Sequence, residues 1–137
     1  MAATVALGFL PPEWPDSADR PLDWAGAVLA IVGANLVYLS ARALGRSLTP
    51  FPRPTRSGEL VTEGPYRLAR HPIYGGGILF FAGWGLFSGP LALLGVAALA
   101  LLWRGKSSLE ERLLAERFPG YEEYRRATPR RFVPFIA

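Results

Sequence analysis

Two long tracts without charged residues dominate the pattern of hydrophobic and polar positions. The first covers residues 24–41, and its 18 residues are interrupted only by the polar side chains Asn35 and Ser40. That length is close to the shortest apolar stretch that crosses a bilayer as a helix. The second covers residues 72–103, and its 32 residues exceed what a single helical crossing needs. We therefore expect the second tract to turn back on itself.

The turn is predicted at Ser88-Gly89-Pro90, because glycine and proline end helices and Pro90 suits the first position of a new one. The arms from His71 to Gly89 and from Gly89 to Ser107 each span about 27 Å of helix, so both end at the same membrane face. The pattern predicts an all-α integral membrane helical bundle. We expect about three transmembrane helices, the last two as a tight hairpin, and a cytoplasmic C-terminal amphipathic helix from Ser107.

Positive charge is concentrated on one side of these spans. Residues 1–23 hold one arginine and four acidic residues, whereas residues 42–71 hold six arginines and residues 104–137 hold eight lysines or arginines. By the positive-inside tendency, the N-terminus and the hairpin turn lie outside, and the loop over 42–71 and the tail over 104–137 are cytoplasmic. We expect a single domain over residues 1–137 in the inner or plasma membrane.

Small residues recur at four-residue spacing in the first span. Gly26, Ala30 and Ala34 share one helical face, and such a face allows another helix to approach closely. The partner helix belongs either to the same chain or to a second copy in a homodimer.

Composition and charge exclude several kinds of site and partner. The chain has no cysteine and one histidine, His71, so neither a disulfide framework nor a metal site is expected. The formal net charge is +4, and half of the residues are hydrophobic. Because the basic residues flank apolar spans, the expected counterparts are the membrane lipids and not nucleic acid.

Polar residues stand at the start of the second tract. His71 and Pro72 suit a helix cap and the first helical position. Backbone N–H groups at such a start attract anions, and Arg70 adds a bidentate donor, which together predict an anion site. A plain cap with arginines that reach toward lipid phosphates is the structural alternative. Gly75-Gly76-Gly77 leaves one face open to a neighbouring helix or a flat ligand.

A second polar group follows the hairpin. Ser108 and Glu111 fit a capping box, which gives Glu111 a structural explanation. Glu110 has no such explanation and suits ribose hydroxyls or a cation. Tyr121 and Tyr124 share a helical face and are typical of interfacial aromatic residues.

Two segments outside the spans are predicted to be extended. The prolines at 50, 52 and 54 favour a stiff, non-helical connector over residues 49–54. The basic strip over residues 128–134 contains Arg130 and Arg131, which suit either lipid phosphates or a bound ligand.

Taken together, these residues resemble a known family. The residues that carry the resemblance are Leu60-Val61-Thr62-Glu63-Gly64-Pro65-Tyr66-Arg67, Arg70-His71-Pro72-Ile73-Tyr74-Gly75-Gly76, Glu110-Glu111, Phe118-Pro119-Gly120-Tyr121, Tyr124, Arg130 and Pro134. At these separations the pattern is similar to the isoprenylcysteine carboxyl methyltransferase and phospholipid methyltransferase superfamily, over about residues 45–135.

The resemblance implies a membrane enzyme that uses S-adenosylmethionine, with the tail over 104–137 covering the cofactor. The acceptor would be lipophilic or interfacial, such as a prenylcysteine carboxylate, a lipid amine or a thiol. Arg70 and Glu110 are the implied catalytic residues. The implied cofactor-binding residues are Arg70, His71, Tyr74, Gly75, Gly76, Glu110, Glu111, Tyr121, Tyr124 and Arg130. The better-known carboxyl methyltransferases have more N-terminal spans, so a homodimer is one way to complete the lipid pocket.

Two other functions stay open at this point. Sterol reductases resemble the chain in their C-terminal membrane half and use NADPH, whose 2′-phosphate would need Arg125 or Arg126. Their acidic residue soon after the aromatic-glycine pair is absent here, because Ile78 follows the three glycines. A non-enzymatic membrane scaffold would use the same motifs only as caps and lipid contacts. No residue identifies the acceptor.

Overall fold

The computed structural model describes residues 1–10, 19–48 and 59–132, and within these ranges all regular secondary structure is helical, with no strand. The predicted all-α class is confirmed for this part of the chain. The connector predicted over 49–54 and Pro134 lie outside the described residues. The helices are α1 Ala2–Leu7, α2 Asp19–Leu44, α3 Pro72–Ser88, α4 Pro90–Arg117 and α5 Tyr121–Ala127, with short 3-10 turns η1 Gly45–Ser47 and η2 Gly64–Arg67.

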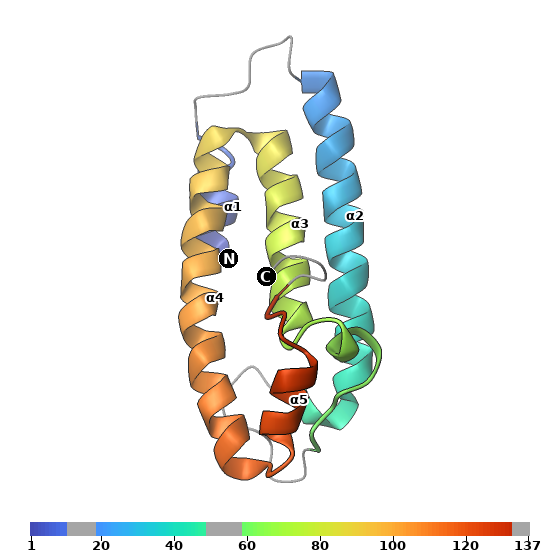
Figure 1. Ribbon diagram of the computed structural model, residues 1–137. Coiled ribbons are helices and arrows are strands. Elements are labelled where there is room, and N and C mark those ends of the chain that lie inside the picture. The colour runs from blue at the N-terminus through green and yellow to red at the C-terminus, as the bar shows by residue number, and fades with distance from the viewer. Residues whose placement is uncertain (11–18, 49–58, 133–137) are drawn as a thin grey trace.

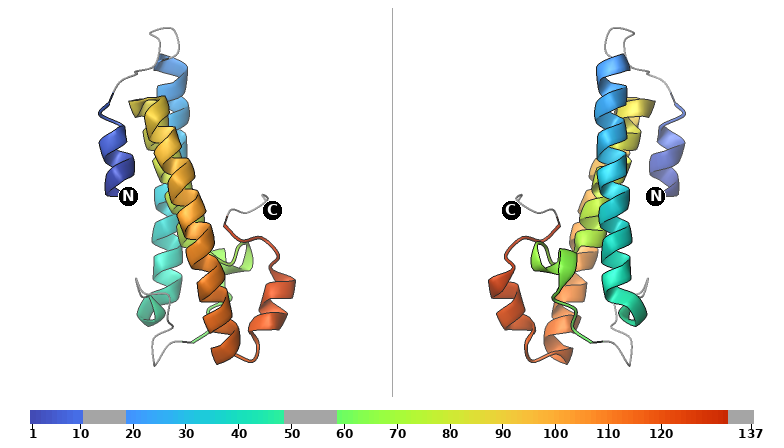
Figure 2. Two further views of the ribbon diagram at one scale, coloured as in Figure 1. Left: turned by 90° about the vertical axis from the view of Figure 1, so that its left-hand side faces the viewer. Right: turned by 90° about the vertical axis from the view of Figure 1, so that its right-hand side faces the viewer.

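Three long antiparallel helices form the body of the molecule. Figure 1 shows α3 between α2 and α4, and α3 contacts both of them. Seen from the side, α1 lies on one face of this layer near the hairpin turn, whereas α5 projects from the other face at the opposite end (Figure 2). Different short helices therefore lie at the two ends of the layer. The polar side chains described below lie at the end near α5.

The turn predicted at Ser88-Gly89-Pro90 is present. Helix α3 ends at Ser88, and α4 begins at Pro90, which is its first residue. Gly89 has φ 135° and ψ 170°, a backbone conformation that disfavours residues with a Cβ atom. A single residue therefore reverses the chain, and the two arms return side by side.

Small residues bring α2 and α3 into backbone contact. A Cβ atom on Gly33 would lie 2.5 Å from the carbonyl oxygen of Gly76, and one on Gly83 would lie 2.5 Å from that of Gly26. The same added atom on Gly83 would be 2.7 Å from the backbone nitrogen of Ala30. The small-residue face of the first span is thus used inside the monomer.

The prediction of that face is wrong for one of its three residues. Ala34 is exposed, whereas Gly33 is buried against α3. The helical surface that faces α3 follows Gly26, Ala30 and Gly33, because side chains three and four residues apart share a face. Helix α3 occupies this face within the single chain, and association of two copies stays a prediction.

Within the part of the chain that the structure describes, two helices are long and apolar enough to cross a membrane, namely Pro21–Leu44 within α2 and Pro90–Arg117, which is α4. Large apolar side chains on α2 are exposed, including Trp24, Val28 and Ile31, as expected for a lipid-facing surface. Helix α3 is uncharged but has only 17 residues. Its crossing as a third span stays a prediction.

The separate amphipathic helix predicted from Ser107 is wrong, because α4 continues without a break from Pro90 to Arg117. The capping box is wrong for the same reason. Ser107 and Ser108 both donate hydrogen bonds to the carbonyl oxygen of Arg104, at 2.9 and 3.0 Å, and so they lie within the helix. A single glycine, Gly105, costs a helix only about 1 kcal/mol and does not end it.

Candidate active site

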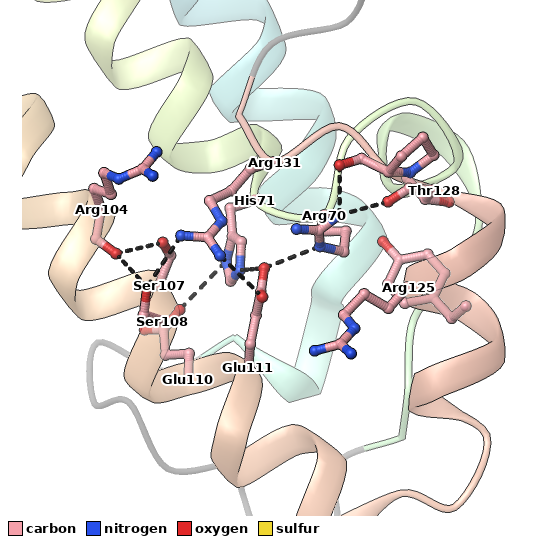
Figure 3. A network of polar contacts seen from close by, with 12 residues as sticks. Arg70, His71, Arg104, Ser107, Ser108, Glu110, Glu111, Arg125, Thr128 and Arg131 are labelled. Atoms are coloured by element: carbon pink, nitrogen blue, oxygen red, sulfur yellow. Dashed lines mark hydrogen bonds and ion pairs between the residues drawn. The ribbon is translucent and has the colours of Figure 1, made fainter. Parts of the chain in front are cut away.

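The hairpin brings the two polar groups of the sequence into direct contact. The hydroxyl of Tyr74, in the first turn of α3, donates a hydrogen bond to Glu110 Oε1 at 2.6 Å. The Nε2 atom of His71 lies 3.2 Å from Glu111 Oε1. Both glutamates belong to α4, about 40 residues further along the chain. We call Arg70, His71, Tyr74, Glu110, Glu111 and Arg131 the polar cluster; Figure 3 shows most of it.

Glu111 is the most highly connected member of the polar cluster. Its carboxylate lies 2.9 Å from Arg70 Nε, 3.2 Å from His71 Nε2 and 3.2 Å from Arg131 Nη2. Glu111 is buried, where an unpaired charge is costly. Arg70 and Arg131, together with the hydrogen bond to His71, therefore stabilise its negative charge at this depth and connect the start of α3, α4 and the tail.

Glu110 has a different set of partners. Besides Tyr74, its carboxylate lies 3.5 Å from His71 Nδ1 and 3.9 Å from Lys106 Nζ. The imidazole of His71 thus stands between two carboxylates. Burial acts to lower the pKa of His71, but the hydrogen bonds to Glu110 and Glu111 outweigh it and raise that pKa above its ordinary value of 6.5.

The described residues after α5, 128–132, lie across the start of α3, and from here on we call this segment the tail. Arg70 Nη1 donates to the carbonyl oxygens of Thr128 and Pro129 at 2.8 and 2.7 Å, and its backbone N–H donates to that of Arg130 at 3.0 Å. The backbone N–H of His71 donates to the carbonyl oxygen of Arg131 at 2.7 Å. A tail carbonyl therefore already accepts the hydrogen bond of one N–H at this helix start, and the anion site expected there stays a prediction.

Each of the three consecutive glycines packs against a different part of the molecule. The position of a Cβ atom on Gly75 is filled by the backbone of Phe132, in the tail. Gly76 faces the backbone of Gly33 and Val37 in α2, and Gly77 faces the ring of Trp103. The glycine face predicted to receive a helix or a flat ligand is thus filled by α2, the tail and an indole.

Trp103 completes an aromatic column that sequence reasoning missed. The rings of His71 and Tyr74 are stacked with centroids 5.6 Å apart, and those of Tyr74 and Trp103 with centroids 5.3 Å apart. Trp103 is buried and stands seven residues before Glu110, which places both on one face of α4. That spacing, together with Gly77, is the signal in the sequence that could have found it.

Tyr121 and Tyr124 form a separate core beside the polar cluster. They are buried with Tyr66, and the hydroxyl of Tyr124 donates to the carbonyl oxygen of Tyr66 at 2.7 Å. The hydroxyl of Tyr121 is buried without a hydrogen-bond partner among the described residues. The side chain of Arg130 is exposed, and its carbonyl holds the tail to Arg70.

Of the ten residues predicted to bind the cofactor, the structure brings five into the polar cluster, namely Arg70, His71, Tyr74, Glu110 and Glu111. The other five lie around it as the glycines, the two tyrosines and Arg130 described above. Sequence reasoning missed the carbonyl groups of Thr128 and Pro129 as partners of Arg70. Within the described ranges no group of three or more acidic or histidine side chains is arranged to hold a metal ion.

Comparison with known proteins finds relatives that match most of the chain. The chain is 42% identical over 120 residues to the cobalt-zinc-cadmium resistance protein CzcN of Cupriavidus metallidurans and 31% identical over 120 residues to the nickel-cobalt-cadmium resistance protein NccN of Alcaligenes xylosoxydans xylosoxydans. Each match covers 85% of this chain and 50% of the relative.

A probable protein-S-isoprenylcysteine O-methyltransferase of Oryza sativa is 34% identical over 110 residues, which cover 75% of this chain and 56% of the relative. The chain thus spans about half the length of the curated relatives it matches. The profile of the phospholipid methyltransferase family matches residues 22–120, which contain the hairpin and both glutamates of the polar cluster. The chain belongs to the phospholipid methyltransferase family.

Proposed function

We propose that the protein is a membrane methyltransferase that binds S-adenosylmethionine at the polar cluster and methylates a lipophilic acceptor. The observation that carries this proposal is the contact of His71 and Tyr74 with Glu110 and Glu111 across the hairpin. Family membership supports the reaction class, and the exposed apolar helices support a membrane setting.

The chemistry of the donor set fits this cofactor. S-adenosylmethionine carries a carboxylate, an ammonium group, a ribose diol and a sulfonium ion, and so it needs both arginine and carboxylate partners. The polar cluster has both, and the buried hydroxyl of Tyr121 has no hydrogen-bond partner among the residues that the structure describes. We assign Arg70 or Arg130 to the cofactor carboxylate and Glu110 or Glu111 to the ribose or amino group, with His71, Tyr74, Gly75, Gly76, Tyr121 and Tyr124 around them.

The protein's own contribution is mainly orientation and exclusion of water. When bound, the cofactor supplies a methyl group on a positively charged sulfur, and this group is displaced in line by a nucleophile. Arg70 and Glu110 would align the reacting groups, since such a transfer gains most from alignment in a dry site. The tail, held by Arg70 at Thr128 and Pro129, would cover the site during transfer.

The acceptor is proposed to approach from the bilayer. The name of the rice relative supports a prenylcysteine carboxylate, and the family name supports a lipid. A lipid amine or a thiol has the same lipophilic character. The distribution of basic residues supports a cofactor site on the cytoplasmic side and the N-terminus outside.

Calorimetry on the purified protein in detergent micelles tests the proposal. We expect binding of S-adenosylhomocysteine and no binding of NADPH. Glu110→Gln should weaken S-adenosylhomocysteine binding about tenfold, because it removes a charged acceptor from the site. Glu116→Gln is the matched control, since Glu116 is exposed on the same helix. Binding of NADPH, or equal affinity in both variants, would contradict the proposal.

A further inference from the structure

Helix α2 lies at one edge of the three-helix layer (Figure 1) and packs against α3 through Gly26, Gly33 and the neighbourhood of Val37. Two residues correspond to roughly 200° of helical rotation, so positions two residues away from these contacts point to the opposite side of α2. That side carries a row of exposed side chains, which we call the outer stripe. The outer stripe consists of Trp24, Val28, Ile31, Asn35 and Tyr38.

The spacing of the outer stripe is that of a helix pair. Its successive members are four, three, four and three residues apart. A repeat with this mean of about 3.5 residues keeps its side chains along one seam between two helices that cross at about 20°. Most of the members are bulky and apolar, and Ile31 at its centre is 62% exposed. The outer stripe therefore has the pattern of one half of a packed seam, whereas a surface that meets only lipid needs no such repeat.

Asn35 is the member of the outer stripe that lipid contact does not explain. Along the helix it is roughly 16 Å from Trp24 and roughly 10 Å from Arg42, which places it inside the hydrocarbon core. Its Nδ2 atom donates a hydrogen bond to the carbonyl oxygen of Ile31 at 2.9 Å. Among the residues that the structure describes, the second N–H and the Oδ1 atom of this amide have no partner. Polar side chains at this depth promote association between helices.

Tyr38, the other member with a hydrogen-bonding group, has a partner within α2. Arg42 Nη1 donates to the hydroxyl of Tyr38 at 3.3 Å, and the guanidinium lies 5.8 Å from the centroid of the Tyr38 ring. The polar atom of Tyr38 is therefore paired at the basic end of the span. This leaves Asn35 as the member of the outer stripe whose polar atoms still need a partner.

We propose that the outer stripe binds the outer stripe of a second copy of this chain, with the two Asn35 amides hydrogen-bonded to each other. A carboxamide is both donor and acceptor, so it pairs with another carboxamide at the same depth. A second copy with the same orientation in the membrane places its own Asn35 at that depth, as two-fold symmetry requires. No residue from 24 to 41 is charged, so the pairing brings no like charges together in the hydrocarbon.

This inference requires that α2 crosses the bilayer, and it is independent of the proposed methyl transfer. The outer stripe faces away from α3, so the polar cluster keeps its contacts when two copies associate. It also differs from the small-residue face, which α3 occupies. Tests of association and tests of cofactor binding can therefore fail separately.

Cysteine crosslinking in liposomes tests the position of the seam, because the chain has no cysteine of its own. Val28→Cys and Ile31→Cys should each form a disulfide between two copies on mild oxidation. Leu94→Cys is the matched control, since Leu94 is 66% exposed but belongs to α4. We expect crosslinking at residues 28 and 31 to be at least about fivefold faster than at residue 94. Equal rates on the two helices overturn the inference.

The same substitution in cell membranes identifies the occupant of the outer stripe. Ile31→Cys should give a crosslinked product of twice the 14.9 kDa of one chain. A product of another mass assigns the outer stripe to a different membrane protein and overturns the inference.

Energy transfer between labelled copies, measured over a range of protein-to-lipid ratios, tests the role of Asn35. Asn35→Leu should raise the dissociation constant of the pair about three- to tenfold. Asn35→Gln retains a carboxamide and should stay within about twofold of the unaltered protein. Because Asn35 is exposed in the single chain, far-ultraviolet circular dichroism should be the same for all three proteins. Monomers at every ratio, or equal dissociation constants for Asn35→Leu and the unaltered protein, overturn the inference.

Discussion

Helix α3 makes two contacts of opposite character. Against α2 it packs backbone to backbone through glycines such as Gly33 and Gly83. At its N-terminal end, Tyr74 and the two residues that precede the helix, Arg70 and His71, belong to the polar cluster, where Glu111 joins α4 to the tail. The first contact depends on the absence of side chains and the second on particular side chains. They should therefore fail in different ways when they are altered.

Disrupting the glycine contact between α2 and α3 should cause the largest loss of stability. Gly33→Leu places a side chain where the backbone of Gly76 and Phe80 now lies. Because backbone cannot move aside as a flexible side chain does, we expect destabilisation of about 3 kcal/mol or more. Thermal unfolding in micelles, followed by near-ultraviolet circular dichroism, measures this loss.

The matched control for this variant is Gly105→Ala. Gly105 lies within α4, and a Cβ atom there would meet nothing within 4 Å. Alanine should therefore stabilise the helix slightly, by up to about 1 kcal/mol. Equal melting temperatures for Gly33→Leu and the unaltered protein would mean that α2 and α3 do not pack in this way.

Disrupting the polar cluster should destabilise the protein less than Gly33→Leu does. Its main effect should be to loosen the tail from the start of α3. Glu111→Gln leaves Arg70, His71 and Arg131 without their shared anion. We expect a cost of about 3 kcal/mol, the lower end for a broken buried ion pair, because Arg131 is partly exposed and Arg70 keeps two carbonyl partners. Hydrogen exchange at the backbone amides of Arg70 and His71 should accelerate, because both are protected by tail carbonyls.

Glu122→Gln serves as the control for the charge change. Glu122 pairs with Arg125 at 2.9 Å, but both side chains are about half exposed. Such surface pairs contribute little, so amide exchange at residues 70 and 71 should not change. Acceleration by both variants would assign the effect to net charge and not to the cluster.

The hairpin could be predicted because local signals specify it. Gly89 and Pro90 punctuate an apolar tract, and arms of equal length then bring His71 near Glu110 and Glu111. The contact between these groups follows from helix geometry alone. Pro119-Gly120 is a second local signal of this kind, and it separates α4, which ends at Arg117, from α5, which begins at Tyr121.

The remaining features depend on contacts between distant residues. Nothing near Arg70 indicates that carbonyl groups 58 and 59 residues away accept its hydrogen bonds. The capping-box pattern at Ser108 is local, yet the helix continues through it because its neighbours also favour helix. Ala34 and Gly33 are both small, but only at position 33 does the backbone of α3 lie where a Cβ atom would be, and this contact exists only once α2 and α3 have packed.

The smallest effect that we expect is a change of stability with pH, to which the polar cluster contributes. It distinguishes the two contacts of α3, because the glycine contact has no titrating group. Glu110 and Glu111 raise the pKa of His71 above 6.5, despite burial. Charged His71 therefore contributes stability that is fully present below its unfolded pKa and is lost as pH rises through the raised folded value. The gap in melting temperature between the unaltered protein and His71→Gln should narrow from about pH 6 to pH 9. Gly33→Leu should show a constant gap over the same range, and a His71→Gln gap that widens with pH would mean that the imidazole is neutral between its two carboxylates.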